Sequence, residues 1–462
     1  MLIRIGISSK IYAEDPTTLV FPPYLHTYGI RKATKFHLFL LLQNRVKFRD
    51  PQGLAVVRLA CWEDTTTTGD DDEVVVYGVN SGQNNIIYNT SMSTLGVYGL
   101  GIKGNESLNK PNGITANGIG DVYVADTGNN RVVRLFNPGN TLEYITEIGN
   151  NDKTTKLLNF PNDVALDSQG NLYVADTGNH RIVVYSLDNL YQYQFGELGT
   201  ENGKFQNPSA IIVRDKMEEW TYYRDNFILV IDLDRTRIQK FSLDGTFISA
   251  LNCQEFLGKS TELEYVDVDY YCNVYATDRK NHCIHKFDRR LNYLTSFGKY
   301  GKGDKEFIEP RGITIYRRFG QVFIAEKAGA QYYWMGTDCT SFGVKSVTNP
   351  FRLLVDYTLT EPSFVTADVF NDNHELVTRI WNQRFQQSGS HRDLWEGRLL
   401  SWPDSVLAKD NLTVSDEYQS TAKIGPGNYE IVYCFEPTYS SFHYFAKEMR
   451  QSFQVEVDSL KK

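Results

Sequence analysis

The sequence predicts an all-β protein in which a β-propeller precedes a β-sandwich. One strand-turn-strand pattern recurs six times along roughly the first two thirds of the chain. Tyr (29) and Phe (26) are abundant among the 462 residues whereas Met is scarce (5), a composition that favours strands over helical bundles. After about Gly343 the repeat stops, but strand-like segments continue. We therefore expect two folded parts, both built from strands.

The repeat is clearest in two segments. Residues 121–135 read DVYVADTGNNRVVRL and residues 171–185 read NLYVADTGNHRIVVY, and four weaker copies surround them. In each copy an acidic or amide residue stands five positions before an Arg or its substitute, and successive copies are 46 to 56 residues apart. The pairs are Asn80/Asn85, Asp126/Arg131, Asp176/Arg181, Asp232/Arg237, Asp278/Cys283 and Glu326/Gln331.

Each repeat has room for four strands. A turn that begins with Pro leads into a short β-branched run, a second strand such as VYVAD follows, and a Thr-Gly-Asn turn precedes the third. The fourth strand is aromatic and ends in Gly, as in residues 191–196. Four antiparallel strands repeated every ~40–50 residues are typical of a β-propeller, in which each repeat forms one blade. The opening prolines are Pro51, Pro111, Pro161, Pro208 and Pro310.

These motifs resemble the NHL repeat family, whose Asn-His-Leu-type segment is matched by residues 179–182, Asn-His-Arg-Ile. The resemblance covers about residues 35–338 and weakens in the last three repeats, where Cys283 and Gln331 replace the Arg. It implies a six-bladed propeller. The charged pairs Asp126/Arg131, Asp176/Arg181 and Asp232/Arg237 are expected to stabilise the turn between the second and third strands rather than to bind a ligand.

The last repeat lacks a recognisable outer strand. Residues 35–42, KFHLFLLL, stand where the outer strand of a preceding blade belongs. We expect this segment to close the ring by pairing with the last blade, since a free sheet edge would otherwise remain. Residues 1–34 lack repeat character and contain Pro16, Pro22 and Pro23, which predicts an extended N-terminal arm.

Residues 345–462 are predicted to form a β-sandwich. Strand-like runs at residues 357–359, 365–370 and 376–380 are separated by polar turns. Their order, over about residues 345–435, resembles the Ig-like domain of flagellar hook-capping proteins, which also ends many secreted bacterial proteins. Trp395 and Tyr429 are expected to anchor its core. The resemblance implies an extracellular or cell-surface location.

Propellers place functional groups around the mouth of the central channel. The position after each opening residue gives a ring of candidate channel-mouth residues, of which Glu264 and Arg311 carry charge and are expected to form an ion pair rather than a catalytic pair. The ring consists of Gln52, Asn112, Asn162, Ser209, Glu264 and Arg311.

No metal site or cofactor is predicted. None of the eight His residues lies at an opening turn of a repeat, so no zinc ligand set can be assembled at the channel mouth. Asp70, Asp71 and Asp72 offer oxygen ligands for calcium, but their spacing is more typical of a solvated turn. No catalytic Ser elbow or zinc-protease motif is present either.

The predicted function is a noncatalytic, extracytoplasmic protein-binding or structural scaffold of a bacterium, with a self-associating subunit of a surface assembly as its specific form. The alternative is a metal-dependent propeller enzyme, a lyase or lactonase acting at the channel. A net charge of −8 argues against nucleic acid as a partner. No apolar run reaches the ~20 residues that a membrane span requires.

Several properties stay open at this stage. The cysteines are scattered without a C-x-x-C pair, so free thiols and disulfides both remain possible. The first residues show no signal peptide, which speaks against the expected location, and residue 1 need not be the native start. The partner, the propeller face that it contacts and the oligomeric state are likewise open. The cysteines are Cys61, Cys253, Cys272, Cys283, Cys339 and Cys434.

Overall fold

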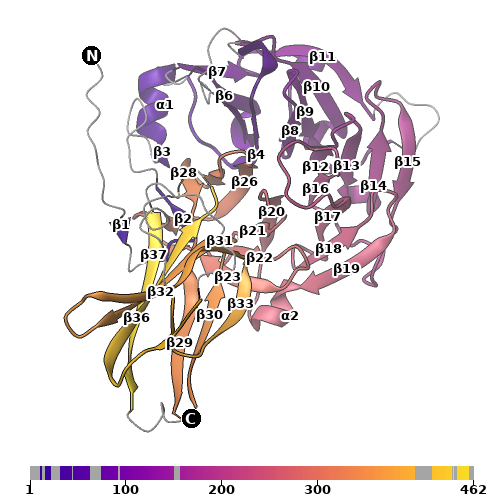
Figure 1. The fold of residues 1–462 in the computed structure, drawn as a ribbon. Coiled ribbons are helices and arrows are strands. Elements are labelled where there is room, and N and C mark those ends of the chain that lie inside the picture. The colour runs from indigo at the N-terminus through magenta and orange to yellow at the C-terminus, as the bar shows by residue number, and fades with distance from the viewer. Residues whose placement is uncertain are drawn as a thin grey trace. The chain divides into compact units, whose positions relative to one another are not determined.

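The computed structural model divides the chain into two compact units, and each is described by itself (Figure 1). The propeller unit comprises residues 24–333, and the second unit comprises residues 1–23 and 334–462. The structure describes residues 11–12, 16–21, 32–43, 45–62, 74–91, 94–149, 157–348, 350–400, 419–439, 441 and 445–456. None of the helices in these ranges is long and apolar enough to cross a membrane.

The propeller unit is built from four-stranded antiparallel sheets, each made of consecutive strands. The first two are β4 to β7 (Pro51–Val57, Val75–Asn80, Asn85–Ser91, Thr94–Tyr98) and β8 to β11 (Ile114–Ala116, Asp121–Asp126, Arg131–Phe136, Glu143–Ile148). The next are β12 to β15 (Pro161–Leu166, Leu172–Asp176, Arg181–Tyr185, Tyr191–Phe195) and β16 to β19 (Ala210–Arg214, Phe227–Asp232, Arg237–Phe241, Phe247–Asn252). Then come β20 to β23 (Leu263–Val268, Val274–Asp278, Cys283–Phe287, Tyr293–Phe297). Together with NHL repeats in the sequence, this arrangement is that of a β-propeller, as the sequence predicts.

The position of a strand within its sheet explains its composition. The second strand β13, LYVAD, is buried along its whole length, which explains its nearly continuous apolar run. The outer strand β15, YQYQF, alternates between half-buried and exposed residues, as expected where one face meets solvent. Neighbouring sheets share apolar cores: Ile182 and Val184 of β14 belong to the same cluster as Ile228 of β17.

The inner strands form a closed ring. Consecutive inner strands β4, β8, β12, β16, β20 and β26 (Pro310–Tyr316) contact one another, and β26 also contacts β4 (Figure 1). In the last sheet β26 pairs with β27 (Gln321–Glu326), and β28 (Gly329–Met335) follows.

The prediction that residues 35–42 form a strand that closes the ring is wrong. Lys35–Leu42 forms helix α1, because it contains no β-branched residue and a capping box starts it: the Thr34 side chain caps the first turn and His37 Nδ1 accepts from Thr34 N–H at 3.1 Å. The edge of β28 is covered by residues of the predicted arm instead. Within the propeller unit β3 (Lys32–Ala33) pairs with Gln331 and Ala330.

The second unit also uses its N-terminal residues for pairing. Here β2 (Leu19–Val20) pairs with Met335 and Trp334 at the end of β28, and β1 (Ile11–Tyr12) pairs in parallel with β37 (Phe445–Val455). The residues around Pro22 and Pro23, where the sequence predicts an extended arm, lie outside the described ranges.

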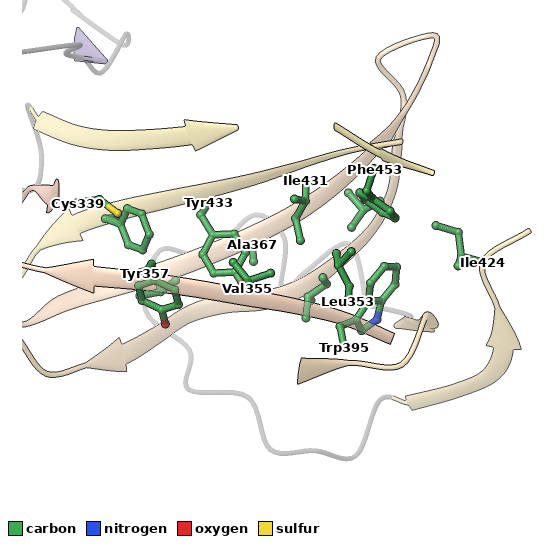
Figure 2. Close-up of a cluster of buried hydrophobic side chains, with 14 of the residues drawn as sticks. Cys339, Leu353, Val355, Tyr357, Ala367, Trp395, Ile424, Ile431, Tyr433 and Phe453 are labelled. Atoms are coloured by element: carbon green, nitrogen blue, oxygen red, sulfur yellow. The ribbon is translucent and has the colours of Figure 1, made fainter. Parts of the chain in front are cut away.

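Two sheets of the second unit enclose one hydrophobic core. One sheet has the order β1-β37-β36-β31-β32, the other β29-β30-β33, and β34 pairs with β35. Strand β30 alternates buried and less buried residues, so Leu353, Val355 and Tyr357 share the core face, and Figure 2 shows them beside Ile431 and Phe453. The strands are β29 (Cys339–Thr348), β30 (Phe351–Leu359), β31 (Ser363–Asn371), β32 (Leu376–Gln386), β33 (Gly389–Trp395), β34 (Arg398–Leu400), β35 (Gln419–Lys423) and β36 (Gly427–Pro437).

Trp395 and Tyr429, the two residues predicted to anchor this core, both contact it. Trp395 is buried within the cluster, and its indole N–H donates to the Arg398 carbonyl at 2.9 Å (Figure 2). Tyr429 is partly buried and packs against the same cluster.

Candidate functional site

The repeat pairs form buried ion pairs inside single sheets. Arg181 Nε lies 2.7 Å from Asp176 Oδ2, and the other carboxylate oxygen, Oδ1, accepts from the Asn159 backbone N–H at 2.7 Å. Since Asn159 belongs to the loop that leads into β12, each pair ties a turn to the loop beside it. The corresponding distances are 2.8 Å for Arg131 Nε to Asp126 Oδ2 and 2.6 Å for Arg237 Nη2 to Asp232 Oδ2. These residues face partners within the fold, and their geometry is structural.

The β20–β23 sheet departs from this pattern. Cys283 stands where the other sheets have Arg, and the partner of Asp278 is His285, whose Nε2 lies 3.1 Å from Asp278 Oδ2. The Cys283 sulfur lies 3.8 Å from the same Nε2. The three side chains are buried, and their donor atoms lie within 4.8 Å of one another. Within the described residues this is a group that can hold a metal ion, and the sequence prediction missed it.

Hydrogen bonds join three residues of the predicted channel-mouth ring, which we call the collar. Asn112 Nδ2 donates to Asn162 Oδ1 at 2.9 Å, and Asn162 Nδ2 donates to the Ser209 carbonyl at 2.5 Å. Gln52 is also buried. The collar lies at the N-terminal ends of the inner strands. Its residues do not line the central cavity.

Glu264 and Arg311 of the collar form ion pairs with other residues. Arg279 Nε lies 2.9 Å from Glu264 Oε1 and Arg235 bonds Oε2, while Arg311 bonds Asp50. Burial raises the pKa of the Glu264 carboxyl, and these arginines, including Arg311, oppose the increase. Glu264 and Arg311 therefore interact electrostatically. The direct ion pair expected between them is not among the ion pairs of the described residues.

A cavity of about 1200 Å³ occupies the centre of the propeller unit. It is lined by the inner strands and by the loops that follow them, so it opens at the end opposite the collar. Gly53 and Gly312 occupy the third positions of β4 and β26, and Gly113 immediately precedes β8. A Cβ on Gly113 would lie 2.0 Å from Asp163 Oδ1, so the missing side chain leaves room for this carboxyl group.

Four charged residues form one network on the cavity wall. Arg214 Nη2 lies 2.8 Å from Asp267 Oδ1, and Arg214 Nη1 lies 3.5 Å from Glu218 Oε1. Glu218 also bonds Arg317. Burial lowers the pKa of Arg317, and the nearby Arg214 lowers it further, while burial raises the pKa of Asp267.

Asp163 and Tyr265 lie on the same cavity wall. Burial raises the pKa of Asp163 to about 8, although the Ile211 N–H donates to its Oδ2 at 2.9 Å. This carboxyl group is therefore largely protonated near pH 7. Among the described residues no hydrogen-bond partner reaches the buried hydroxyl of Tyr265 or the Nε of Arg214. Both atoms are themselves buried from solvent, although their residues line the cavity.

Exposed apolar side chains surround the opening of this cavity. Ile119 (66% exposed), Leu187 (44%) and Met217 (67%) line it from three different loops, and Trp220 lies beside Met217. We call Ile119, Leu187 and Met217 the rim. Large exposed apolar side chains at the mouth of a concave cavity are a feature of binding sites.

The sequence prediction chose residues near the start of each inner strand, and these do not line the cavity. It selected the residue that follows each opening residue of a repeat, which is the second residue of β4, β12, β20 and β26, whereas Asp163 and Tyr265 are third residues of their strands and Asp267 is a fifth. Because side chains of a strand alternate between faces, the third and fifth share a direction that the second does not. A charged residue at an odd position of an inner strand was the available signal. The calcium candidates Asp70, Asp71 and Asp72 lie outside the described residues.

Comparisons with known proteins agree with the repeat. Residues 108–135 and 158–185 match the NHL repeat family. The protein brain tumor of Drosophila melanogaster is 26% identical over 103 residues, which span 21% of this chain and 10% of that protein. The chain therefore spans about a tenth of the length of this curated relative.

Solved structures with low similarity include two enzymes. Virginiamycin B lyase from Staphylococcus aureus is 15% identical with a TM-score of 0.39, over 56% of this chain and 76% of the lyase. A luciferin-regenerating enzyme is 11% identical with a TM-score of 0.42, over 65% of this chain and 94% of the enzyme. Similarity at this level indicates nothing about activity or substrate.

Proposed function

We propose that this chain is a noncatalytic binding protein made of a six-bladed NHL propeller and an Ig-like sandwich, and that its propeller binds a protein partner at the rim. Six blades are supported by the closed order of contacts among the inner strands β4, β8, β12, β16, β20 and β26. An Ig-like second unit is supported by two sheets around a common core.

The observation that carries the proposal is the rim with its polar interior. Ile119 and Met217 expose large apolar side chains to solvent, an arrangement that costs free energy unless a partner covers them. Behind them, the charged residues Arg214, Asp267 and Arg317 line the cavity. A protein loop that places apolar residues on the rim and one polar side chain in the cavity satisfies both features.

Site-specific crosslinking tests this assignment. A photoreactive amino acid at Met217 is expected to crosslink to one defined partner in the source cells, and Ile119→Glu is expected to abolish that crosslink. Ile145, an exposed residue of the outer strand β11, is the control position and should give no such product. Equal crosslinking at both positions, or a partner that Ile119→Glu does not affect, contradicts the proposal.

A channel enzyme is the second candidate, and one observation favours it. The raised pKa of Asp163, about 8, suits a general acid working near neutral pH. If the cavity is catalytic, purified protein turns over a lactone or related small molecule, and Asp163→Asn removes that turnover while leaving crosslinking at Met217 unchanged.

We also propose an extracellular or cell-surface location for a self-associating scaffold. The resemblance of the second unit to domains of secreted bacterial proteins supports the location. Protease treatment of intact source cells should degrade the chain, and light scattering of the purified protein should detect particles larger than one chain. Protection from protease would contradict the proposed location. A monomer at high concentration would contradict self-association.

A further inference from the structure

The β20–β23 sheet replaces the repeat's Arg with two donors that bind metals. Cys283 occupies the position of Arg131, Arg181 and Arg237 in the other sheets. His285, two residues later, occupies the position of Val133, Val183 and Gln239. The acidic member of the pair, Asp278, is retained. One thiol, one imidazole and one carboxylate therefore meet where a salt bridge lies elsewhere.

Backbone pairing fixes these three side chains against one another. Asp278 of β21 is paired directly with Cys283 of β22, and Ala276 is paired with His285. Residues two apart on a strand share one face, so Cys283 and His285 project to the same side. Tight packing leaves no freedom for other arrangements, since all three side chains are buried.

The separations between donor atoms match tetrahedral coordination. Zinc binds sulfur at about 2.3 Å and nitrogen or oxygen at about 2.0–2.2 Å, so the edges of its tetrahedron measure roughly 3.3–3.6 Å. His285 Nε2 lies 3.1 Å from Asp278 Oδ2 and 3.8 Å from Cys283 Sγ. The third pair, the Asp278 carboxylate oxygen and the Cys283 sulfur, lies within 4.8 Å.

Outer contacts orient the donors as in metal sites. Ser296 Oγ lies 2.7 Å from His285 Nδ1, which directs the opposite nitrogen, Nε2, to Asp278 and Cys283. Asn281 Nδ2 donates to Asp278 Oδ2 at 2.6 Å. An imidazole held through its other nitrogen is a recurring feature of zinc ligands.

We propose that Asp278, Cys283 and His285 bind a zinc ion inside the β20–β23 sheet. Zinc would take over the cross-strand role of the Asp–Arg ion pair. The mixed Cys, His and Asp donor set suits zinc rather than calcium or magnesium.

Zinc binding must release protons. A thiol must lose its proton when its sulfur coordinates zinc, so the Cys283 Sγ–H proton is released to solvent. His285 Nδ1 lies 2.7 Å from Ser296 Oγ.

The competing interpretation is a hydrogen bond alone, in which His285 donates to Asp278 in place of Arg and Cys283 merely packs. The variant His285→Gln separates the two. Gln239 already makes this contact in the β16–β19 sheet, where its Nε2 lies 3.3 Å from Asp232 Oδ2. His285→Gln therefore preserves a donor to Asp278 and the fold, but it removes the imidazole ligand.

The experiment titrates the full chain, stripped with a chelator, with zinc chloride and cobalt chloride. We expect one zinc per chain, thiolate-to-cobalt charge-transfer absorption, and a higher Tm with zinc than without it. Cys283→Ser and His285→Gln should weaken zinc binding at least about 100-fold, and Ser296→Ala should weaken it about 10-fold. The exposed Cys61→Ser serves as the matched control and should bind zinc like the parent chain.

Two results overturn the zinc site. One is a parent chain that binds no zinc at saturating metal and shows no thiolate absorption. The other is zinc binding that both Cys283→Ser and His285→Gln, shown to be folded by circular dichroism, leave unchanged.

Discussion

Single charged residues join each turn of the propeller to the loop beside it. The carboxylate of Asp176 accepts from Arg181, from the Asn179 side chain and from the Asn159 backbone, all within one buried pocket. Such a group stabilises the fold only while its partners remain, because an unpaired buried charge is costly. The Asp and Arg that recur in the repeat therefore stabilise the fold.

Removing the guanidinium of such a pair should destabilise the propeller strongly. Arg181→Leu leaves the buried Asp176 carboxylate with neutral donors only, and we expect the free energy of unfolding to fall by about 3 kcal/mol in urea titrations. Arg392→Leu, which breaks the exposed pair between Arg392 and Asp356, is the control and should cause no measurable change. Equal effects of both variants would refute the structural role.

Asp163 should make stability depend on pH. Its folded-state pKa is about 8 whereas an unfolded Asp titrates near 4, so between these values the folded state holds a proton that the unfolded state has lost. The free energy of unfolding should therefore fall as pH rises from about 4 to 8, by at most ~1.4 kcal/mol per pH unit from this group.

The variant Asp163→Asn isolates this contribution. Asn keeps the size of the protonated carboxyl and does not titrate, so urea unfolding at pH 5 and pH 8.5 should show a flatter pH dependence and a more stable protein at the higher pH. The exposed Asp188→Asn should retain the parent's dependence. Identical slopes for parent and Asp163→Asn would show that Asp163 is ionised in the folded state.

The elements are joined into a ring by their turns. Asn84, Asn130, His180 and His282 each end a turn between second and third strands with φ near +55°. The side chain of each accepts from a backbone N–H that leads into the following sheet, for example Phe160 N–H to Asn130 Oδ1 at 2.8 Å. Asn tolerates this left-handed conformation, which explains its frequency at the position.

Two substitutions at Asn130 separate conformation from hydrogen bonding. Asn130→Gly keeps the positive φ but removes the acceptor, so the free energy of unfolding should fall by about 1 kcal/mol. Asn130→Ala also strains the backbone and should cost about 1 kcal/mol more. Denaturant midpoints measure both steps, and a Gly variant as stable as the parent would exclude a contribution from the hydrogen bond.

Helix α1 shows that an expectation about ring closure can outweigh local signals. Its apolar run KFHLFLLL suits either a short buried strand or a helix, and the expected ring closure favoured the strand. The local sequence favours the helix, because Thr34 and His37 form a capping box and the run contains no β-branched residue. Leu38 and Leu42 face the core while Phe36, Phe39 and Leu40 are exposed.

At the scale of the whole molecule, β28 is protected by chain from the other end of the sequence. Within the propeller unit β3 covers its first half, and within the second unit β2 covers its end. An uncovered strand edge is a template for pairing with other chains. The N-terminal residues therefore contribute to folding although they lack any repeat.

Deleting residues 1–34 should expose this edge. We expect the truncated chain to form larger particles than the full chain in size-exclusion chromatography with light scattering, and amide protons of residues 329–335 to exchange faster. Unchanged particle size together with unchanged exchange would show that the pairing contributes nothing to closure.

The sequence by itself determined the repeating strands and the pairs such as Asp126 and Arg131, because these depend on short periods and nearby residues. It placed the end of the repeat near residue 343, whereas the structure divides the chain between residues 333 and 334 and strand β29 runs through Gly343. Only the tertiary structure decided which side chains line the cavity, since Asp163 and Asp267 meet through ring closure. It also decided what covers β28 and that Asp278, Cys283 and His285 converge. Such juxtapositions arise from strand register and ring geometry, which no local pattern encodes.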